Sequence, residues 1–452
     1  MKISFRGLIA LLFSALATSV GAQSFEIIYS FTNSFSAPRN PIGGGLICGP
    51  DGNFYGTTEY GGAGGFGTVF KLTPAGVLTI LANFGPPGGG VPVGGVIFGP
   101  DGFLYGTTSF PLSTIFKVSI NGGISNVYTA TNGTFNAGIT FAPDGTIFGT
   151  TLSGGINANG TVFRLDTNGL FTTLYSFEAT TNLANSSGIQ PYAGLVWGPD
   201  GNLYGTTASG GAYLAGTVFR ITPDGDFSAL ESFNNTNGAD PNATMIVGPD
   251  GAMYGTTVNG GDGVVFRLTT NGVLTTLISF NSFDGASPEA GVIFGPDGNL
   301  YGTTSGGGSG YFGTVFRLTT NGNLTTLVNF NNSNGSYAKT SLTFGRDGLL
   351  YGTTFSGDGN GANAEGEMFR VDVGLAVTNV PPPIAVSSNG AVAVNLPVVT
   401  GSTSRLWSTT NLLQPLDQWS VLATNFSAFP LLQYVDTNLG AFSERFFRTT
   451  TP

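Results

Sequence analysis

The residues of this sequence that could do chemistry are carboxylates and aromatic side chains that interrupt an otherwise repetitive chain. Two carboxylates about 5–10 Å apart can hydrolyse a glycosidic bond without histidine. Aromatic rings beside Asn and Thr can instead stack on sugar rings, while the amides and hydroxyls bond the sugar hydroxyl groups. The carboxylates in question are Glu59, Asp262, Asp284, Glu289, Asp358 and Glu365. The aromatic candidates for ligand binding are Tyr60, Phe66, Phe110, Tyr213, Tyr311, Phe312 and Phe355.

Composition removes most other chemistry. The 452 residues include no His and one Cys, Cys48, which excludes Ser-His-Asp triads, imidazole-bound zinc, internal disulfides and four-thiolate metal sites. No Asp-x-Asp-x-Asp-Gly calcium loop occurs. We therefore predict no catalytic residue of these classes, no metal and no cofactor. The net charge of −10, with only 15 basic residues, argues against nucleic acid and anionic membrane as partners.

Residues 1–22 have the features of a secretory signal peptide. Lys2 and Arg6 precede a short apolar run, and small residues end at Ala22, where cleavage is expected. The run is too short to span a bilayer about 30 Å thick, and no later segment is apolar enough to span one. A secreted or cell-surface protein without a membrane span, and monomeric, is the expectation.

A repeat of about 50 residues must position the candidate side chains. Tyr-Gly-Thr-Thr begins at Tyr55, Tyr105, Tyr204, Tyr254, Tyr301 and Tyr351, with Phe-Gly-Thr-Thr at Phe148, and the copies start 50, 43, 56, 50, 47 and 50 residues apart. An Asp-Gly turn precedes every copy, and an aromatic-basic pair such as Phe316-Arg317 follows it. Each unit contains four short runs rich in β-branched and aromatic residues, which predicts a four-stranded propeller blade.

Seven such units predict a closed seven-bladed β-propeller over residues 23–374. The seventh unit ends after Val371 without a fourth strand, whereas 25–31 resembles a fourth strand with no unit before it. We therefore expect 25–31 to complete the last blade and to remove an open sheet edge. An open solenoid is the competing architecture.

The Tyr-Gly-Thr-Thr and Gly-Thr-Val-Phe-Arg motifs at this period resemble the GloVer (Gloeo-Verruco) tandem-repeat family of exported bacterial proteins, over residues 44–372. The resemblance implies export and a variable C-terminal anchoring module, and it carries no established activity. The Pro-Asp-Gly-x-Leu-Tyr unit is also similar, in a generic way, to the NHL and gluconolactonase-like propeller repeats.

The composition changes after the repeats. A Pro-rich linker over residues 375–383 leads to 384–452, where short β-like runs predict a small sandwich-like β domain. An apolar sorting tail followed by basic residues, usual in the resembling family, is missing, so anchoring through such a tail is not expected.

The repeated residues themselves are predicted to be structural. We expect each turn Asp to pair with the Lys or Arg of its own blade, the Gly of Tyr-Gly-Thr-Thr to permit close approach between blades, and Cys48 to be a buried core residue. Function should then lie in the variable loops between second and third strands. The main hypothesis is an exported, non-catalytic module that binds carbohydrate or a cell-surface protein. An extracellular carbohydrate-active enzyme and a purely structural surface component are the alternatives.

Overall fold

The computed structural model describes residues 24–41, 44–85, 89–180, 185–357 and 364–375, together with strands between 384 and 450. The predicted signal peptide, most of the predicted linker and Asp358 lie outside these residues. Among the described residues, no helix is present that is long and apolar enough to cross a membrane.

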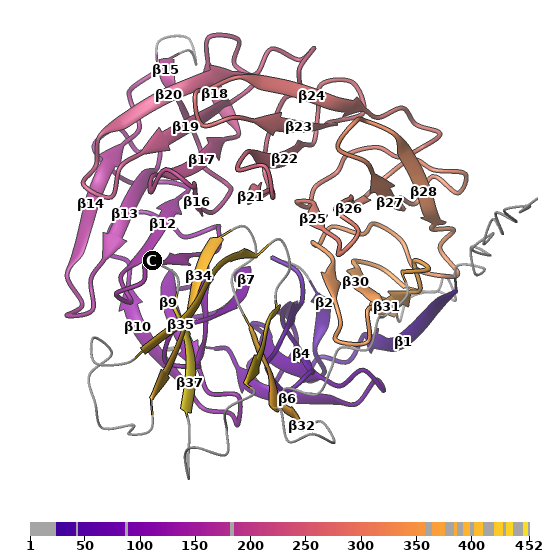
Figure 1. The fold of residues 1–452 in the computed structure, drawn as a ribbon. Helices are drawn as coiled ribbons and strands as arrows, with labels where there is room; N and C mark the ends of the chain where they lie inside the picture. Colours follow the sequence, from indigo (N-terminus) through magenta and orange to yellow (C-terminus); the bar gives the residue numbers. More distant parts are fainter. Residues whose placement is uncertain are drawn as a thin grey trace, which may run out of the picture.

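Seven antiparallel sheets stand around a common axis, which confirms the predicted seven-bladed propeller (Figure 1). The first strand of each blade lies nearest the axis and the fourth lies on the outside. From the axis outward, blade 1 has β3 (Ile47–Cys48), β4 (Phe54–Tyr60), β5 (Thr68–Leu72) and β6 (Leu78–Asn83), and blade 2 has β7 (Pro92–Phe98), β8 (Leu104–Thr108), β9 (Thr114–Val118) and β10 (Ile124–Thr129). In the same order, blade 3 has β11 (Thr140–Phe141), β12 (Ile147–Thr151), β13 (Thr161–Leu165) and β14 (Phe171–Ser176); blade 4 has β16 (Val196–Trp197), β17 (Leu203–Thr207), β19 (Thr217–Ile221) and β20 (Phe227–Ser232); and blade 5 has β21 (Ile246–Val247), β22 (Met253–Thr257), β23 (Val264–Leu268) and β24 (Leu274–Ser279). Blade 6 has β25 (Ile293–Phe294), β26 (Leu300–Thr304), β27 (Thr314–Leu318) and β28 (Leu324–Asn329), and blade 7 has β29 (Thr343–Phe344), β30 (Leu350–Thr354), β31 (Ala364–Val371) and β1 (Phe25–Thr32).

Additional strands lie in the connections and after the propeller. Short strands β2 (Arg39–Pro41), β15 (Asn185–Ile189) and β18 (Ser209–Gly211) belong to the connections. Beyond the propeller, one sheet has the order β32-β33-β36 and another the order β35-β34-β37. Their bounds are β32 (Ile384–Val386), β33 (Val392–Pro397), β34 (Ser402–Thr409), β35 (Ser420–Ser427), β36 (Leu431–Asp436) and β37 (Phe446–Thr450).

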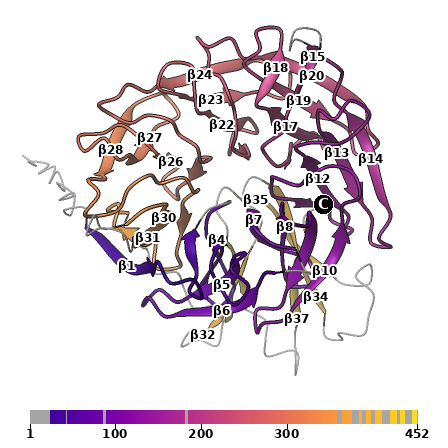
Figure 2. The ribbon, with the colours of Figure 1, turned by 180° about the vertical axis from the view of Figure 1, so that it is seen from behind.

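The N-terminal strand closes the ring, as predicted (Figure 2). β1 pairs antiparallel with β31, with Phe25 opposite Val371 and Ile27 opposite Phe369. The Arg370 guanidinium reaches across this pair to Glu26, with 2.6 Å between Nη2 and Oε2. Blade 7 is therefore built from both ends of the repeat region.

A phenylalanine within or after each fourth strand joins that blade to the next; in blade 2 it is Phe135, which lies in the connection beyond β10. Its ring packs at a steep angle on the third-strand Phe of the following blade, with ring centroids 4.9–5.7 Å apart. Phe31 of β1 makes this contact with Phe70 of blade 1, so the pattern continues across the closure. The other pairs are Phe84–Phe116, Phe135–Phe163, Phe177–Phe219, Phe233–Phe266, Phe280–Phe316 and Phe330–Phe369.

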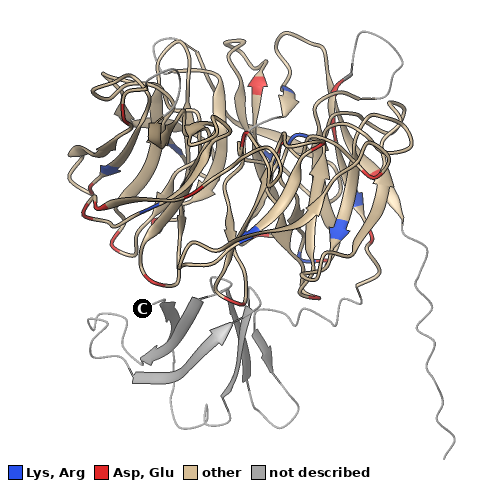
Figure 3. Cartoon of the chain, turned by 90° about the horizontal axis from the view of Figure 1, so that it is seen from above, with Lys and Arg blue, Asp and Glu red and all other residues tan. Residues whose placement is uncertain are grey.

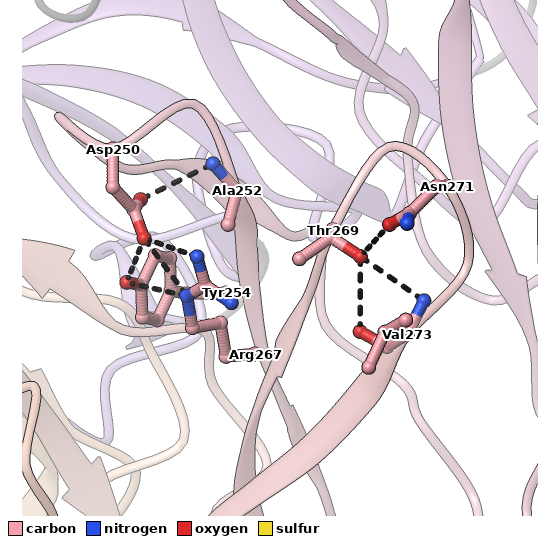
Figure 4. Close-up of polar contacts among 7 residues, drawn as sticks. All are labelled: Asp250, Ala252, Tyr254, Arg267, Thr269, Asn271 and Val273. Atoms are coloured by element: carbon pink, nitrogen blue, oxygen red, sulfur yellow. Dashed lines mark hydrogen bonds and ion pairs between the residues drawn. The ribbon is translucent and has the colours of Figure 1, made fainter.

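The tyrosine of Tyr-Gly-Thr-Thr fixes the turn that precedes it. In six blades its hydroxyl donates to Oδ2 of the turn Asp at 2.5–3.0 Å, while Oδ1 accepts from the backbone two residues on. Figure 4 shows this arrangement for Asp250, Tyr254 and Arg267. The predicted Asp–Lys/Arg pairing is wrong as a general rule: in the described residues it is found for Asp250–Arg267 (2.7 Å) and Asp101–Lys117 (3.8 Å), and Arg370 turns to Glu26 instead. The tyrosine hydroxyl is the recurrent partner.

The glycine of the motif makes room within a blade, not between blades as predicted. A Cβ on Gly302 would lie 2.5 Å from Cζ of Phe316, which is opposite it on β27 of the same blade. Gly205 and Phe219 repeat this geometry in blade 4. The third-strand Phe ring therefore packs in the space that a side chain at this glycine would fill.

The two threonines have separate roles. The first donates across to a backbone carbonyl of the next blade, as Thr107 does to Ala137 O at 2.7 Å and Thr256 to Ala290 O at 2.9 Å. The second shares a hydrogen bond of 2.7–2.9 Å with a third-strand Thr of its own blade, in the pairs Thr58–Thr68, Thr108–Thr114, Thr151–Thr161, Thr207–Thr217 and Thr304–Thr314. The whole motif is thus occupied by folding.

These tyrosine–aspartate bonds predict how stability depends on pH. Burial alone would raise the pKa of Asp200, but hydrogen bonds from Asn202 and Tyr204 outweigh it and lower that pKa; Asp51 behaves alike. Burial and the bond to Asp200 raise the pKa of Tyr204. A carboxyl group whose pKa is lowered by folding stabilises the fold above about pH 4, and this stabilisation is lost in more acid solution. A phenol whose pKa is raised by folding stabilises the fold below about pH 10, and this stabilisation is lost at higher pH.

Because the chain has no His, we expect the melting temperature to be flat from about pH 5 to pH 9 and to fall on both sides. Thermal melts between pH 2 and pH 11 check this, and Tyr204→Phe should weaken both limbs. A transition centred between pH 6 and pH 8 would contradict the prediction.

Candidate functional site

The loop face of the propeller carries the residues that folding leaves free. We define it by the loops between second and third strands and the connections between blades; the Pro-Asp-Gly and Asn-Gly turns make up the opposite, turn face. Antiparallel order within each blade puts these two sets of connections at opposite ends. Because the side chains of the repeated motif already make contacts that stabilise the blades, we look for functional residues on the loop face.

Exposed apolar side chains gather on this face. Among the described residues, the large hydrophobics exposed there are Phe35, Tyr60, Phe110, Leu112, Ile156, Tyr213, Leu214, Phe283, Tyr311 and Tyr337. The remaining exposed ones, on outer strands or turns, are Val77, Ile80, Ile124, Leu170 and Val273. A concentration of this kind on one face is typical of a binding surface.

The predicted aromatic residues fall into two groups. Tyr60, Phe110, Tyr213 and Tyr311 are exposed, each on a different blade. The others are half-buried: Phe66 and Phe312 pack against blade cores, and Phe355 lies under the Lys339 ammonium at 5.3 Å from the ring centroid. Phe312 also meets Tyr337, with ring centroids 6.0 Å apart. Their role in binding stays a prediction.

Several exposed residues were not predicted. Ile156, Leu112 and Leu214 lie in the same second-to-third-strand loops but are aliphatic, and Phe35, Phe283 and Tyr337 lie in the connections between blades. Attention to aromatic residues in one loop class missed them. Searching both loop classes for any large apolar residue would have found all of these.

The backbone under Tyr311 is strained. Tyr311 has φ +64° with its side chain 69% exposed, and Leu214 has φ +63° at the corresponding point of blade 4. In blade 1 this point is Gly65, a residue type that adopts positive φ without penalty. Tyr311 is a functional candidate because its side chain, being exposed, gains little burial to offset the cost of the positive φ.

Three of the six predicted carboxylates have partners in their own surroundings. Asp262 accepts a hydrogen bond from the Ser282 hydroxyl at 2.8 Å, and Asp284 accepts from the Asn281 amide. Glu289 forms an ion pair with Lys339 at 3.2 Å. In the part of the chain that the structure describes, no group of three or more His, Cys, Asp and Glu residues could hold a metal ion.

Cys48 is half-buried rather than fully buried as predicted. It occupies the inner-strand position that Phe98 and Trp197 hold, equally half-buried, in other blades. Burial raises the pKa of its thiol despite the opposing charge of Arg346. The thiolate is therefore disfavoured, and Cys48 has the character of a packing residue.

A ring of small residues surrounds the axis where the inner strands begin on the loop face. Neighbouring members approach closely: a Cβ on Gly45 would lie 2.4 Å from Ser341 O, and one on Gly291 would lie 2.8 Å from Thr244 O. The Gly194 amide donates to Thr244 Oγ1 at 2.9 Å. We call this the axial ring; its members are Gly45, Gly95, Gly138, Gly194, Thr244, Gly291 and Ser341.

Solved structures with a similar fold include two bacterial proteins. Virginiamycin B lyase from Staphylococcus aureus matches with a TM-score of 0.55 and 17% identity, over 77% of this chain and 99% of that one. A gluconolactonase from Xanthomonas campestris matches with a TM-score of 0.41 and 12% identity, over 79% and 92%. At 17% identity, the likeness to the lyase concerns the fold alone.

Sequence comparison identifies the family. No curated protein sequence matches the chain. The family model of the Gloeobacter/Verrucomicrobia repeat matches residues 15–198 and 190–411, which together cover most of the chain. This agrees with the resemblance carried by the Tyr-Gly-Thr-Thr motif, and the chain belongs to the Gloeobacter/Verrucomicrobia repeat family.

Proposed function

We propose that this protein is an exported, non-catalytic binding module that holds carbohydrate on its loop face. The observation that carries the proposal is the exposure of Tyr311 in a backbone conformation that favours glycine. A residue kept at a cost to folding points to a ligand. Exposed rings on several blades, beside Asn, Ser and Thr in the same loops, suit stacking on an extended sugar chain.

A non-catalytic role fits the carboxylates better than hydrolysis does. Glycoside hydrolysis needs two carboxyl groups facing a common space, one of them free to give a proton. Asp262, Asp284 and Glu289 are instead engaged with Ser282, Asn281 and Lys339. Sugar binding needs no such pair.

The replacement Tyr311→Gly tests this proposal. It removes an exposed ring, so we expect glycan binding to fall at least fivefold. Glycine also adopts the positive φ without steric strain, so we expect the melting temperature to stay the same or rise. A glycan array followed by titration of the best ligand measures the binding. Leu170→Ala, which removes an exposed apolar residue from the turn face, should leave binding unchanged.

Three results would overturn the proposal. Release of product from a bound glycan would favour the enzyme hypothesis. Failure to bind any glycan would favour a protein partner or a structural role. Equal affinity of Tyr311→Gly and the unaltered protein would remove the argument from strain.

Export is part of the proposal. The support is the positively charged start and short apolar run of residues 1–22. Expression of the full chain in a bacterium should yield an extracytoplasmic protein whose mass corresponds to cleavage near Ala22. An uncleaved product in the cytoplasm would contradict it.

A further inference from the structure

We propose a second ligand site at the loop-face entrance of the propeller axis, one that takes a single neutral sugar unit. It is made by the residues two positions before the axial ring in blades 3 to 7. We call these the polar mouth; they are Asn136, Tyr192, Asn242, Glu289 and Lys339. The inference takes its ligand class from the proposed function, but the site is separate from the exposed loop tips.

The fold places these residues around the axis. The axial ring is continuous from blade to blade, so the residues two positions earlier in each chain segment encircle the same axis. Figure 1 shows the inner strands β16, β21 and β25, which these residues precede, facing the centre of the ring. Blade 2 contributes Val93 at this position.

The backbone of the polar mouth is held rigidly by the preceding blade. The Thr150 hydroxyl donates at 2.9 Å to Ala193 O, directly after Tyr192, and Thr206 donates at 3.2 Å to Pro241 O, directly before Asn242. The same type of bond fixes Ala137, Ala290 and Thr340, which follow Asn136, Glu289 and Lys339. Such a frame presents side chains with little ordering cost on binding.

In blades 4 to 7, the residue two positions before the polar-mouth residue is held as well. Gln190, Asp240, Ser287 and Tyr337 have φ between +52° and +57°. Each donates its N–H to a loop carbonyl of the preceding blade at 2.8–3.1 Å. The segment that carries the polar mouth is therefore fixed at both ends.

The residue type at the polar-mouth position varies from blade to blade, although the positions beside it repeat. Ala or Gly follows this position in most blades, yet the position itself holds Asn, Tyr, Glu, Lys or Val. Folding therefore sets the neighbours and leaves this position free for recognition.

The chemistry fits a neutral polyhydroxylated ligand. Two amides and a phenol supply both donors and acceptors, as sugar hydroxyl groups require. The one ammonium is balanced by the one carboxylate at 3.2 Å, and it also lies over the Phe355 ring. Neither an anionic nor a cationic sugar finds an unbalanced charge among these residues.

Titration of the full exported chain with methyl glycosides tests the inference. The neutral probes are those of glucose, galactose, mannose and N-acetylglucosamine, and the charged probes are methyl glucuronide and glucosamine. We expect at least one neutral glycoside to bind and to lose about tenfold in affinity with Asn242→Ala or Asn136→Ala. Tyr192→Phe, which removes only a hydroxyl, should weaken it too.

The controls separate this inference from the proposed function. Asn121→Ala, an exposed Asn on the turn face, should change nothing, and Tyr311→Gly should weaken glycan chains but not methyl glycosides. If glycan chains bind but no methyl glycoside does, or if the polar-mouth variants bind as before, the inference fails and the proposed function stands. Preference for a charged probe overturns the inference. Absence of all carbohydrate binding overturns both.

Discussion

Replacing Phe31 with alanine is expected to lower the free energy of unfolding by about 3–4 kcal/mol. Phe31 is 1% exposed and packs on Tyr29 and on Phe70, with ring centroids 5.0 and 5.7 Å away. Through this contact β1, the closing strand, helps to join blade 7 to blade 1. Urea denaturation of the purified chain measures the effect.

Phe35→Ala is the matched control, because it removes the same side chain four residues later from a site that is 67% exposed. Its cost should stay within about 0.5 kcal/mol. Equal and small effects of the two substitutions would mean that the ring does not depend on β1 for closure.

Gly302→Val should destabilise the protein by about 3 kcal/mol through overpacking. The added side chain would start 2.5 Å from Cζ of Phe316 and 3.1 Å from Cγ1 of Val292, both in a fully buried region. Gly302 has no positive φ, so its substitution adds no backbone strain and the cost is steric.

Phe316→Leu should rescue part of that loss, because leucine lacks the Cζ atom that the new side chain would meet. The coupling between the two substitutions then measures the contact directly. Gly298→Ala is the control: a Cβ there meets nothing within 4 Å, so only its φ of +75° opposes the change, at about 1 kcal/mol. Independent effects of Gly302→Val and Phe316→Leu would contradict the assignment of the glycine to its own blade.

The sequence predicted the blades and their closure because both follow from local patterns repeated in order. Pro-Asp-Gly turns, β-branched runs and an orphan fourth strand over 25–31 suffice to place the four main strands of each blade, but not the short strands β2, β15 and β18. The wrong predictions concern which side chains contact each other, not where the blade strands lie. The constant spacing of four residues between Asp250 and Tyr254, repeated in five other blades, was a signal for the hydrogen bond that charge-based reasoning overlooked.

The candidate site was predicted less well because it lies where the repeat breaks. Loops of different length share no template, so whether Phe312 is half-buried and Tyr311 exposed depends on local backbone geometry. The sequence gives no sign of the positive φ of Tyr311, because tyrosine is unfavourable in that conformation. The axial position of Asn242 and Lys339 follows only once the blades are assembled.

The pairing of β1 with β31 also determines how the ring would respond to mechanical load. Phe25 begins one strand and lies opposite Val371, which ends the other, so the chain enters and leaves the closing sheet at the same end. Tension applied between the two ends of the propeller would peel these strands apart one hydrogen bond at a time instead of shearing them together. If the protein is held at both termini outside the cell, blade 7 is where it would yield first.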